Sequence, residues 1–142
     1  MQNQKKLFPI TWEQVHRDAK QLAHKLKQEK TFTAIIAIGR GGLVPAAILA
    51  RELKIDLIDT ICLNSDNNSD TIIKKPCLEQ EHILIIDDIA NNGNTLQTIK
   101  PLFPQAHFAC LYTKQEGKKY VQTFITEVSQ DTWIVFPWDN DA

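Results

Sequence analysis

The sequence contains the stretch Ile83-Leu84-Ile85-Ile86-Asp87-Asp88-Ile89-Ala90-Asn91-Asn92-Gly93-Asn94-Thr95. Its first four residues are apolar and mostly β-branched, which favours a strand buried on both faces, and we expect that strand to end at the two aspartates. A polar loop with one glycine follows, and a helix is predicted from Thr95 to Phe103. Strand, loop and helix in this order form the repeating unit of parallel α/β sheets.

The same order occurs earlier in the chain. Ala34-Ile35-Ile36-Ala37-Ile38 predicts a second buried strand, and Gly39-Arg40-Gly41-Gly42 forms the loop after it. Pro45 suits the first turn of the helix that we expect next. Apolar runs at 57–63 and 107–112 add two more strands. We therefore predict an α/β fold with an open, mostly parallel sheet flanked by helices.

A helix is predicted before the first strand, because Thr11 and Gln14 have the spacing of a capping box. Residues 64–80 form the longest polar connection, at about 17 residues, which exceeds the usual length of a connection within a domain. We predict a flexible, functional loop there, placed over the site.

Size and charge limit the organisation and the partners of the chain. Its 142 residues fit a single domain, 1–142. The 16 Lys and Arg residues against 17 Asp and Glu give a net charge of -1, which argues against nucleic-acid binding, since that requires a basic surface. We find no apolar signal core and no run near the roughly 18 apolar residues of a spanning helix, so we expect a cytoplasmic protein without a transmembrane segment.

The three cysteines, Cys62, Cys77 and Cys110, are an odd number without CxxC spacing. Cys62 and Cys110 lie within apolar, strand-like runs. We therefore predict free thiols, buried at these two positions, rather than disulfides or a metal site.

Four of the five glycines lie in the two loops that follow the apolar strands. In open α/β sheets, ligands bind beyond the carboxyl ends of the strands, where both loops are expected. Gly93-Asn94-Thr95 offers backbone N–H groups and a hydroxyl to a phosphate, and Arg40 with Gly41 offers donors to a second anion. The alternatives are an ordinary Asn-Gly turn with a helix cap and a tight turn at Gly39 to Gly42.

Asp87 and Asp88 are adjacent carboxylates at the end of an apolar strand, where charge is costly unless it is satisfied. Sugar hydroxyls or Mg²⁺ would satisfy both groups. The alternative is a pair of carboxylates exposed to water.

These residues carry a resemblance to a known family. Ile86-Asp87-Asp88 followed by a phosphate loop resembles the motif with which type I phosphoribosyltransferases bind 5-phosphoribosyl 1-pyrophosphate (PRPP), most closely in the bacterial members that act on 6-oxopurines. The resemblance extends from Ile10 to Asp139 and implies the type I phosphoribosyltransferase fold. The other stretches that carry it are Arg40-Gly41-Gly42-Leu43-Val44-Pro45, Ala50-Arg51-Glu52-Leu53, Asp59-Thr60-Ile61-Cys62, Ala106-His107-Phe108, Gln130-Asp131-Thr132-Trp133-Ile134 and Pro137-Trp138-Asp139.

The resemblance implies transfer of the phosphoribosyl group of PRPP to xanthine, guanine or hypoxanthine, which releases pyrophosphate and serves purine salvage. Arg40 and the Gly41 amide, after a cis Gly39–Arg40 peptide, would hold the pyrophosphate. Asp87 and Asp88 would hold the ribose hydroxyls, with Asp88 nearest Mg²⁺. The implied PRPP-binding residues are Arg40, Gly41, Asp87, Asp88, Ile89, Ala90, Asn91, Asn92, Gly93, Asn94 and Thr95.

The resemblance also assigns the purine to the segment 114–142. Lys114 would donate to the 6-oxo group, Trp133 would stack on the ring, and the backbone of Ile134 would read the 2-substituent. Without the family, Lys114 is interpreted as a surface cation and Trp133 as a core aromatic. The family further implies a homo-oligomer, either a dimer or a tetramer.

The chain departs from the family pattern in its phosphate loop, where Asn91, Asn92 and Asn94 replace Asp, Thr and Gly. The family's aspartate takes the purine ring proton, whereas Asn91 accepts a hydrogen bond but no proton near neutral pH. General-base help is worth about 10²–10⁴-fold in rate. Arg40 and, in a reduced role, Asn91 are thus the expected catalytic residues. Asn94 is expected to keep the loop geometry, since Asn tolerates positive φ.

Two other interpretations are weighed against an active transferase. The first is a weakly active or inactive relative that binds PRPP or a nucleotide as a regulator, which the asparagines motivate. The second is a receiver-like domain with a phosphoaccepting Asp pair, which leaves Arg40, Lys114 and Trp133 unexplained.

Overall fold

A computed structural model of the chain describes residues 6–66, 69–78 and 81–139. In chain order the elements are β1 (Lys6–Pro9), α1 (Trp12–Glu29), β2 (Ala34–Gly39), α2 (Leu43–Leu53), β3 (Ile58–Asp66), β4 (Ser69–Lys74), β5 (Ile83–Ala90), α3 (Asn94–Ile99), β6 (His107–Lys114), β7 (Thr123–Val128) and β8 (Thr132–Val135). Two 3₁₀ turns, Lys100–Leu102 and Lys118–Tyr120, follow α3 and β6.

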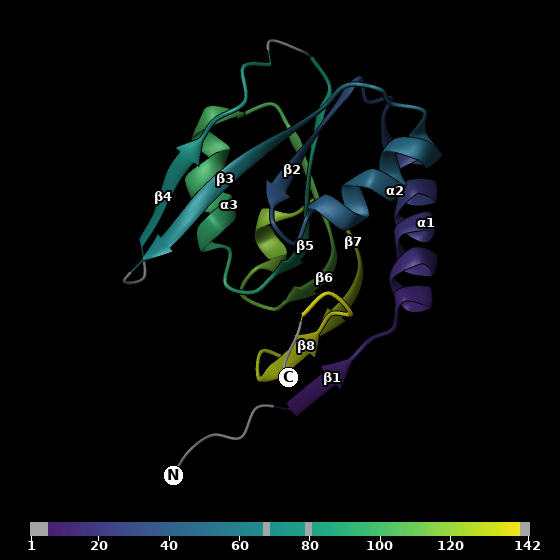
Figure 1. The fold of residues 1–142 in the computed structure, drawn as a ribbon, viewed down its shortest axis with the longest axis vertical. Helices are drawn as coiled ribbons and strands as arrows, with labels where there is room; N and C mark the ends of the chain where they lie inside the picture. The colour runs from purple at the N-terminus through teal and green to yellow at the C-terminus, as the bar shows by residue number, and fades with distance from the viewer. Residues whose placement is uncertain (1–5, 67–68, 79–80, 140–142) are drawn as a thin grey trace.

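Within the described residues, the main sheet has six strands in the order β4-β3-β2-β5-β6-β7. All neighbouring pairs are parallel except β3 and β4, which are antiparallel. Because β2 and β5 are neighbours and parallel, the loops that follow them emerge at the same edge of the sheet (Figure 1). The prediction of an open, mostly parallel α/β sheet is confirmed.

Helices cover both faces of the sheet, and each face has its own apolar core (Figure 1). The helices α1 and α2 pack on one face, where Leu22, Leu26 and Leu49 are fully buried. The helix α3 packs on the other face through Leu96 and Ile99. Every residue of β6 is buried, as expected for an interior strand between two helical layers.

The caps predicted for α1 are present. The Thr11 side chain accepts a hydrogen bond from the Gln14 backbone N–H, and the Gln14 side chain accepts one from the Thr11 N–H at 2.7 Å. The first turn of α2 contains Pro45, and the helix ends at Leu53, also as predicted.

Strands β1 and β8 form a separate two-stranded parallel sheet at the carboxyl edge of the main sheet (Figure 1). Leu7 pairs with Trp133 and Phe8 with Ile134 in this ladder. No local sequence pattern predicts β1, β7 or β8. The small sheet brings the N-terminal strand beside the segment predicted to bind the purine.

The structure differs from the predicted loop at 64–80. Strand β3 continues to Asp66, and Ser69–Lys74 pairs with it as β4, so most of this segment is a hairpin at the edge of the sheet. Polar residues are accommodated there because an edge strand exposes a face to water while its backbone bonds to one neighbour. Mobility of this segment stays a prediction.

Candidate functional site

The carboxyl end of β5 presents the two predicted acidic residues. Asp87 and Asp88 are half-buried. Each accepts a hydrogen bond from the next backbone N–H, Asp87 from Asp88 at 2.8 Å and Asp88 from Ile89 at 2.7 Å. One oxygen of each carboxylate is thereby oriented by the chain.

The glycine loop after β2 lies directly against Asp88. A Cβ atom added at Gly41 would overlap the Asp88 carboxylate, and one added at Gly42 would overlap the carbonyl oxygens of Ile86 and Ile38. The Gly39–Arg40 peptide is cis, as the family resemblance implied, and Arg40 is exposed beside it. Two loops that are about 50 residues apart in sequence therefore meet, because their strands are parallel neighbours.

The segment predicted to hold the 5′-phosphate lines a cavity of about 160 Å³. Its lining residues are Asp87, Asp88, Ile89, Ala90, Asn91, Asn92, Gly93, Thr95 and Leu96. The lining includes every residue of the predicted 5′-phosphate segment 91–95 except Asn94. Backbone N–H groups at the start of a helix are suited to bind an anion in such a hollow.

The expectation for Asn94 is wrong in its detail. The positive φ in this loop, 85°, belongs to Gly93, and Asn94 is the first residue of α3. The Asn92 side chain accepts a hydrogen bond from the Asn94 N–H at 3.0 Å. At Gly93 a Cβ atom would also overlap the Tyr120 ring, so glycine is required there on two grounds.

Thr95 has a protein partner. Its hydroxyl donates to Oδ2 of Asp70 at 3.0 Å, and Asp70 lies on β4. The hairpin therefore contacts the predicted phosphate loop. Lys74, the last residue of β4, is paired with β3, because its Nζ donates to Asp59 Oδ1 at 2.7 Å and to the Thr60 carbonyl at 2.8 Å.

The predicted purine residues are also brought together. Lys114 ends β6 and is buried, and its Nζ lies 5.8 Å from the centroid of the Trp133 ring. Trp133 is 44% exposed and so presents ring surface for stacking. The side chain of Ile134 is buried, which leaves its backbone for recognition. The interpretations of Lys114 as a surface cation and of Trp133 as a core residue are both wrong.

Asn91 is exposed, and its backbone carbonyl accepts a hydrogen bond from the Gln130 side chain at 3.2 Å. Neither Gln130 nor Asp70 was identified from sequence as a contact of the phosphate loop. Gln130 does lie within one of the stretches that carry the family resemblance, whereas nothing in the sequence pattern marks Asp70.

Electrostatics set the acidic pair apart from ordinary carboxylates. Burial raises the pKa of Asp87 well above its usual range, and the adjacent Asp88 carboxylate raises it further. Burial also raises the pKa of Asp88, and it outweighs the hydrogen bonds from Asp87 and from the Ile89 N–H, which lower this pKa. The nearby negative charge of Asp139 raises the pKa of Asp88 as well. A cation or a hydroxyl donor placed here would favour the charged forms of both.

The donor set fits Mg²⁺ but not a metal held by protein alone. Among residues 6–66, 69–78 and 81–139, no three His, Cys, Asp or Glu side chains are grouped to hold a metal ion. Mg²⁺ is commonly held by one or two carboxylates together with substrate phosphates and water, for which Asp87 and Asp88 suffice. The free thiols predicted from sequence are present, with Cys110 buried, Cys62 half-buried instead of buried, and Cys77 exposed.

Comparisons with known proteins agree with this geometry. The family model of the phosphoribosyl transferase domain matches residues 11–141. The chain is 51% identical over 143 residues to a xanthine-guanine phosphoribosyltransferase of Nitratidesulfovibrio vulgaris strain Hildenborough, covering 97% of this chain and 88% of that protein. It is 50% identical to the protein of that name from Desulfotalea psychrophila, with 97% and 89% covered.

A purine phosphoribosyltransferase from Pyrococcus horikoshii has a similar solved structure, with a TM-score of 0.85, 26% identity and 96% of both chains covered. Within the described part of the chain, no helix has the length and apolar character to span a membrane. The meeting of the two glycine loops at the acidic pair, and the match over nearly the whole length, show that the chain belongs to the phosphoribosyltransferase family.

Proposed function

We propose that this chain transfers the phosphoribosyl group of PRPP to a 6-oxopurine, namely xanthine, guanine or hypoxanthine, in purine salvage. The products are the nucleoside 5′-monophosphate and pyrophosphate. The observation that carries this proposal is the close approach of Gly41 to Asp88, because it brings the glycine loop after β2 into contact with the acidic pair at the end of β5. The relatives named xanthine-guanine phosphoribosyltransferase support it.

On the ribose side, Asp87 and Asp88 accept hydrogen bonds from the two sugar hydroxyls. The backbone N–H groups of residues 91–95 and the Thr95 hydroxyl surround the 5′-phosphate in the cavity next to this pair. Arg40 and the Gly41 amide hold the pyrophosphate and stabilise the charge that it gains on leaving. The transition state resembles an oxocarbenium ion, so the site acts mainly by positioning and by electrostatics.

Mg²⁺ is part of this proposal, with Asp88 holding it directly or through water and Asp87 beside it. When bound, the ion supplies neutralising charge for the departing pyrophosphate. The raised pKa values of both carboxyls support a site that gains stability from a cation.

On the purine side, the Lys114 ammonium donates to the 6-oxo group while the Trp133 ring stacks on the base. Their separation of 5.8 Å and the exposure of the ring support these roles. The backbone of Ile134 reads the 2-substituent. Asn91 orients the purine ring nitrogen by a hydrogen bond without removing its proton.

Assembly into a dimer or a tetramer is proposed as well. Large apolar side chains are exposed near the small sheet, with Leu7 at 69%, Trp12 at 55% and Phe8 at 44%. Apolar groups gathered in this way often mark contacts between proteins. Light scattering coupled to size-exclusion chromatography measures the oligomer directly.

The decisive experiment measures pyrophosphate release with PRPP, Mg²⁺ and each of the three purines in turn, with PRPP binding measured by calorimetry in parallel. Turnover with at least one purine supports the proposal. Binding of PRPP without turnover of any purine would refute it and would favour a nucleotide-binding regulator.

A further inference from the structure

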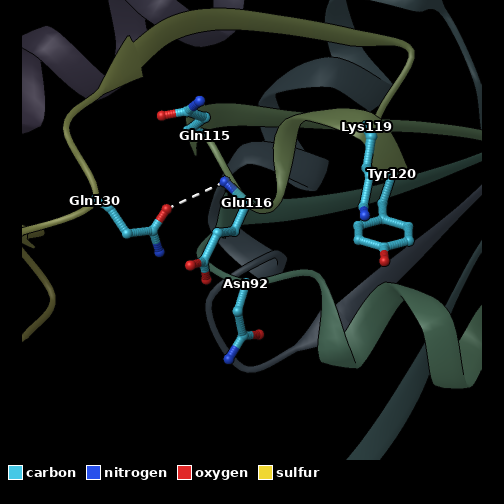
Figure 2. Close-up of a pocket in the computed structure, with 6 residues that line it drawn as sticks. All are labelled: Asn92, Gln115, Glu116, Lys119, Tyr120 and Gln130. Carbon is cyan, nitrogen blue, oxygen red and sulfur yellow. Dashed lines mark hydrogen bonds between the residues drawn. The ribbon is translucent and has the colours of Figure 1, made fainter.

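The side chain of Gln130 bridges two segments that come from different strands. It lies in the turn between β7 and β8. Its Oε1 accepts a hydrogen bond from the Glu116 backbone N–H at 3.1 Å, which Figure 2 shows as a dashed line. Its Nε2 donates to the Asn91 carbonyl at 3.2 Å. One amide therefore joins the loop after β5 to the loop after β6.

Both partners of Gln130 are backbone groups of fixed polarity. The Glu116 N–H can only donate and the Asn91 carbonyl can only accept, so only one orientation of the Gln130 amide satisfies both. A side chain with a single kind of hydrogen-bonding group cannot make this bridge.

The turn that carries Gln130 is itself held by three hydrogen bonds. The Ser129 hydroxyl lies 2.5 Å from Asp131 Oδ1 and 2.5 Å from the Thr132 hydroxyl, and the Thr132 N–H donates to the Ser129 carbonyl at 3.0 Å. Trp133 follows at once in β8. The position of Gln130 is thus coupled to that of the Trp133 backbone.

The two bridged loops are also in contact near Gln130. A Cβ atom at Gly117 would overlap the Ala90 carbonyl, and the Thr113 hydroxyl lies 3.4 Å from that same carbonyl oxygen. Ala90 and Thr113 are partners in the ladder between β5 and β6. Gln130 extends this contact from the sheet to the loops beyond it, where the ladder ends.

We infer that Gln130 is a positioning residue that holds the ribose-phosphate loop in register with the purine-binding segment. Through Glu116 it reaches the segment that begins with Lys114, and through Asn91 it reaches the phosphate loop. The inference rests on the proposed function, in which the purine nitrogen must face the anomeric carbon of PRPP. Small errors in that alignment lower the rate of a two-substrate reaction steeply.

The bridge borders an open pocket of about 560 Å³ that Asn92, Lys119 and Tyr120 also line (Figure 2). Water therefore competes with both hydrogen bonds. We expect a moderate effect on the reaction and little on the overall stability.

The variants Q130A and Q130E test the inference, with Q122A as the matched control. Gln122 also accepts a hydrogen bond from a backbone N–H, that of Phe108 at 2.7 Å, but at the opposite end of β6 from Lys114. Glutamate at 130 keeps an acceptor for the Glu116 N–H but has no donor for the Asn91 carbonyl.

Dissociation constants are measured by calorimetry for GMP, which spans both loops, and for PRPP, which uses the ribose side only. We expect Q130A and Q130E to weaken GMP binding about tenfold and to change PRPP binding less than twofold. In steady state, kcat falls about threefold to tenfold for Q130A, while Q122A resembles the wild type in both ligands and in kcat. All three variants keep a melting temperature close to that of the wild type.

Any of three results would overturn the inference. The first is an equal loss of affinity for GMP and for PRPP in the Gln130 variants, and the second is a wild-type affinity for GMP in Q130E. The third is a loss of GMP affinity in Q122A as large as that in Q130A. The proposed function is judged separately, on pyrophosphate release by the wild type. A wild type that binds GMP but does not turn over refutes the function and leaves the binding comparison valid. A wild type that binds neither ligand refutes both.

Discussion

The hydroxyl of Thr95 donates a hydrogen bond to Oδ2 of Asp70 at 3.0 Å and so joins β4 to the first turn of α3. The Thr95 hydroxyl is also the group that the proposed function assigns as a hydrogen-bond donor to the 5′-phosphate, and here it donates to Asp70 instead. A carboxylate and a phosphate compete for one hydroxyl, and their like charges repel each other. Binding of PRPP is therefore expected to displace the hairpin from Thr95.

This competition predicts that D70A binds PRPP more tightly than the wild type, by about threefold to tenfold, the range of a hydrogen bond to a charged group that is partly exposed. D70N removes the charge but keeps an acceptor, so its gain is expected to be smaller. Calorimetry with PRPP and Mg²⁺ measures both. D56A, in the exposed loop before β3, serves as the control, and unchanged or weaker PRPP binding by D70A would contradict the prediction.

Replacement of Asn91 tests the missing base. N91D supplies a carboxylate where the wild type has an amide, and we expect kcat to rise by about tenfold to 10²-fold. This increase is below the upper range of general-base catalysis because the loop holds an amide, not a carboxylate, in the wild type. N91A is expected to gain nothing. Steady-state rates of pyrophosphate release with saturating purine provide the measurement.

The lack of a protein base at position 91 also predicts the pH dependence of the wild type. Without a protein base, the purine must lose its ring proton to water, so the rate rises with pH and xanthine, the most acidic of the three purines, is preferred. N91D is expected to flatten this profile near neutral pH. Equal, pH-independent rates of the wild type with all three purines would count against the role assigned to Asn91.

The raised pKa of Asp87 predicts a pH-dependent stability difference. Because its pKa is higher in the folded chain than in the unfolded one, the folded state binds more protons, and the free energy of unfolding falls as pH rises from about 4 through the folded pKa. D87N cannot lose a proton and keeps an acceptor for the Asp88 N–H. The free energy of unfolding of D87N should be higher than that of the wild type at pH 7.5, and the difference should shrink toward pH 4.

Asp59 provides a control of opposite sign. The hydrogen bond from Lys74 lowers the pKa of Asp59 in the folded chain. The contribution of Asp59 to the free energy of unfolding is therefore complete above its pKa in the unfolded chain, and it is lost only as pH falls through its pKa in the folded chain. D59N should therefore destabilise equally at pH 6 and pH 8. Urea denaturation of D87N and D59N between pH 4 and pH 8 measures both effects. If the difference in free energy of unfolding between D87N and the wild type did not change with pH, burial could not be the cause of the raised pKa of Asp87.

Adjacent glycines in the loop after β2 should respond differently to alanine. At Gly41 the atoms nearest the added Cβ all belong to the Asp88 carboxylate, so G41A is expected to displace that side chain and lower kcat/KM at least tenfold with little loss of stability. At Gly42 it meets two backbone carbonyls, which cannot move freely, so G42A should cost about 1–3 kcal/mol of unfolding free energy. Kinetics and thermal unfolding of the two variants separate these effects, and full activity of G41A would contradict the placement of Asp88.

Elements whose signal lies within a few residues could be predicted from sequence. The Thr11 cap, the apolar run of β2 and the apolar start of β5 depend on local propensity and periodicity, and all three appear where they were expected. The family resemblance added the roles of Lys114 and Trp133, which composition and spacing do not provide. The receiver-like alternative is wrong, since the family match covers residues 11–141.

Elements that depend on a distant partner could not be predicted in this way. Strand β4 has a polar sequence and exists through pairing with β3, and β1 has four exposed residues that are ordered by pairing with β8. Such short strands gain little from their own side chains, so their signal is absent from the local pattern.

The chain's local chemistry was thus enough to determine the α/β class, the two glycine loops and the acidic pair, because each arises from residues that are neighbours in sequence. The tertiary structure alone decided that Asp70 contacts Thr95 and that Gln130 joins Asn91 to Glu116. These contacts link residues up to 39 positions apart. They form only when the sheet assembles, since strand pairing brings β4 and the separate loops within hydrogen-bonding distance of one another.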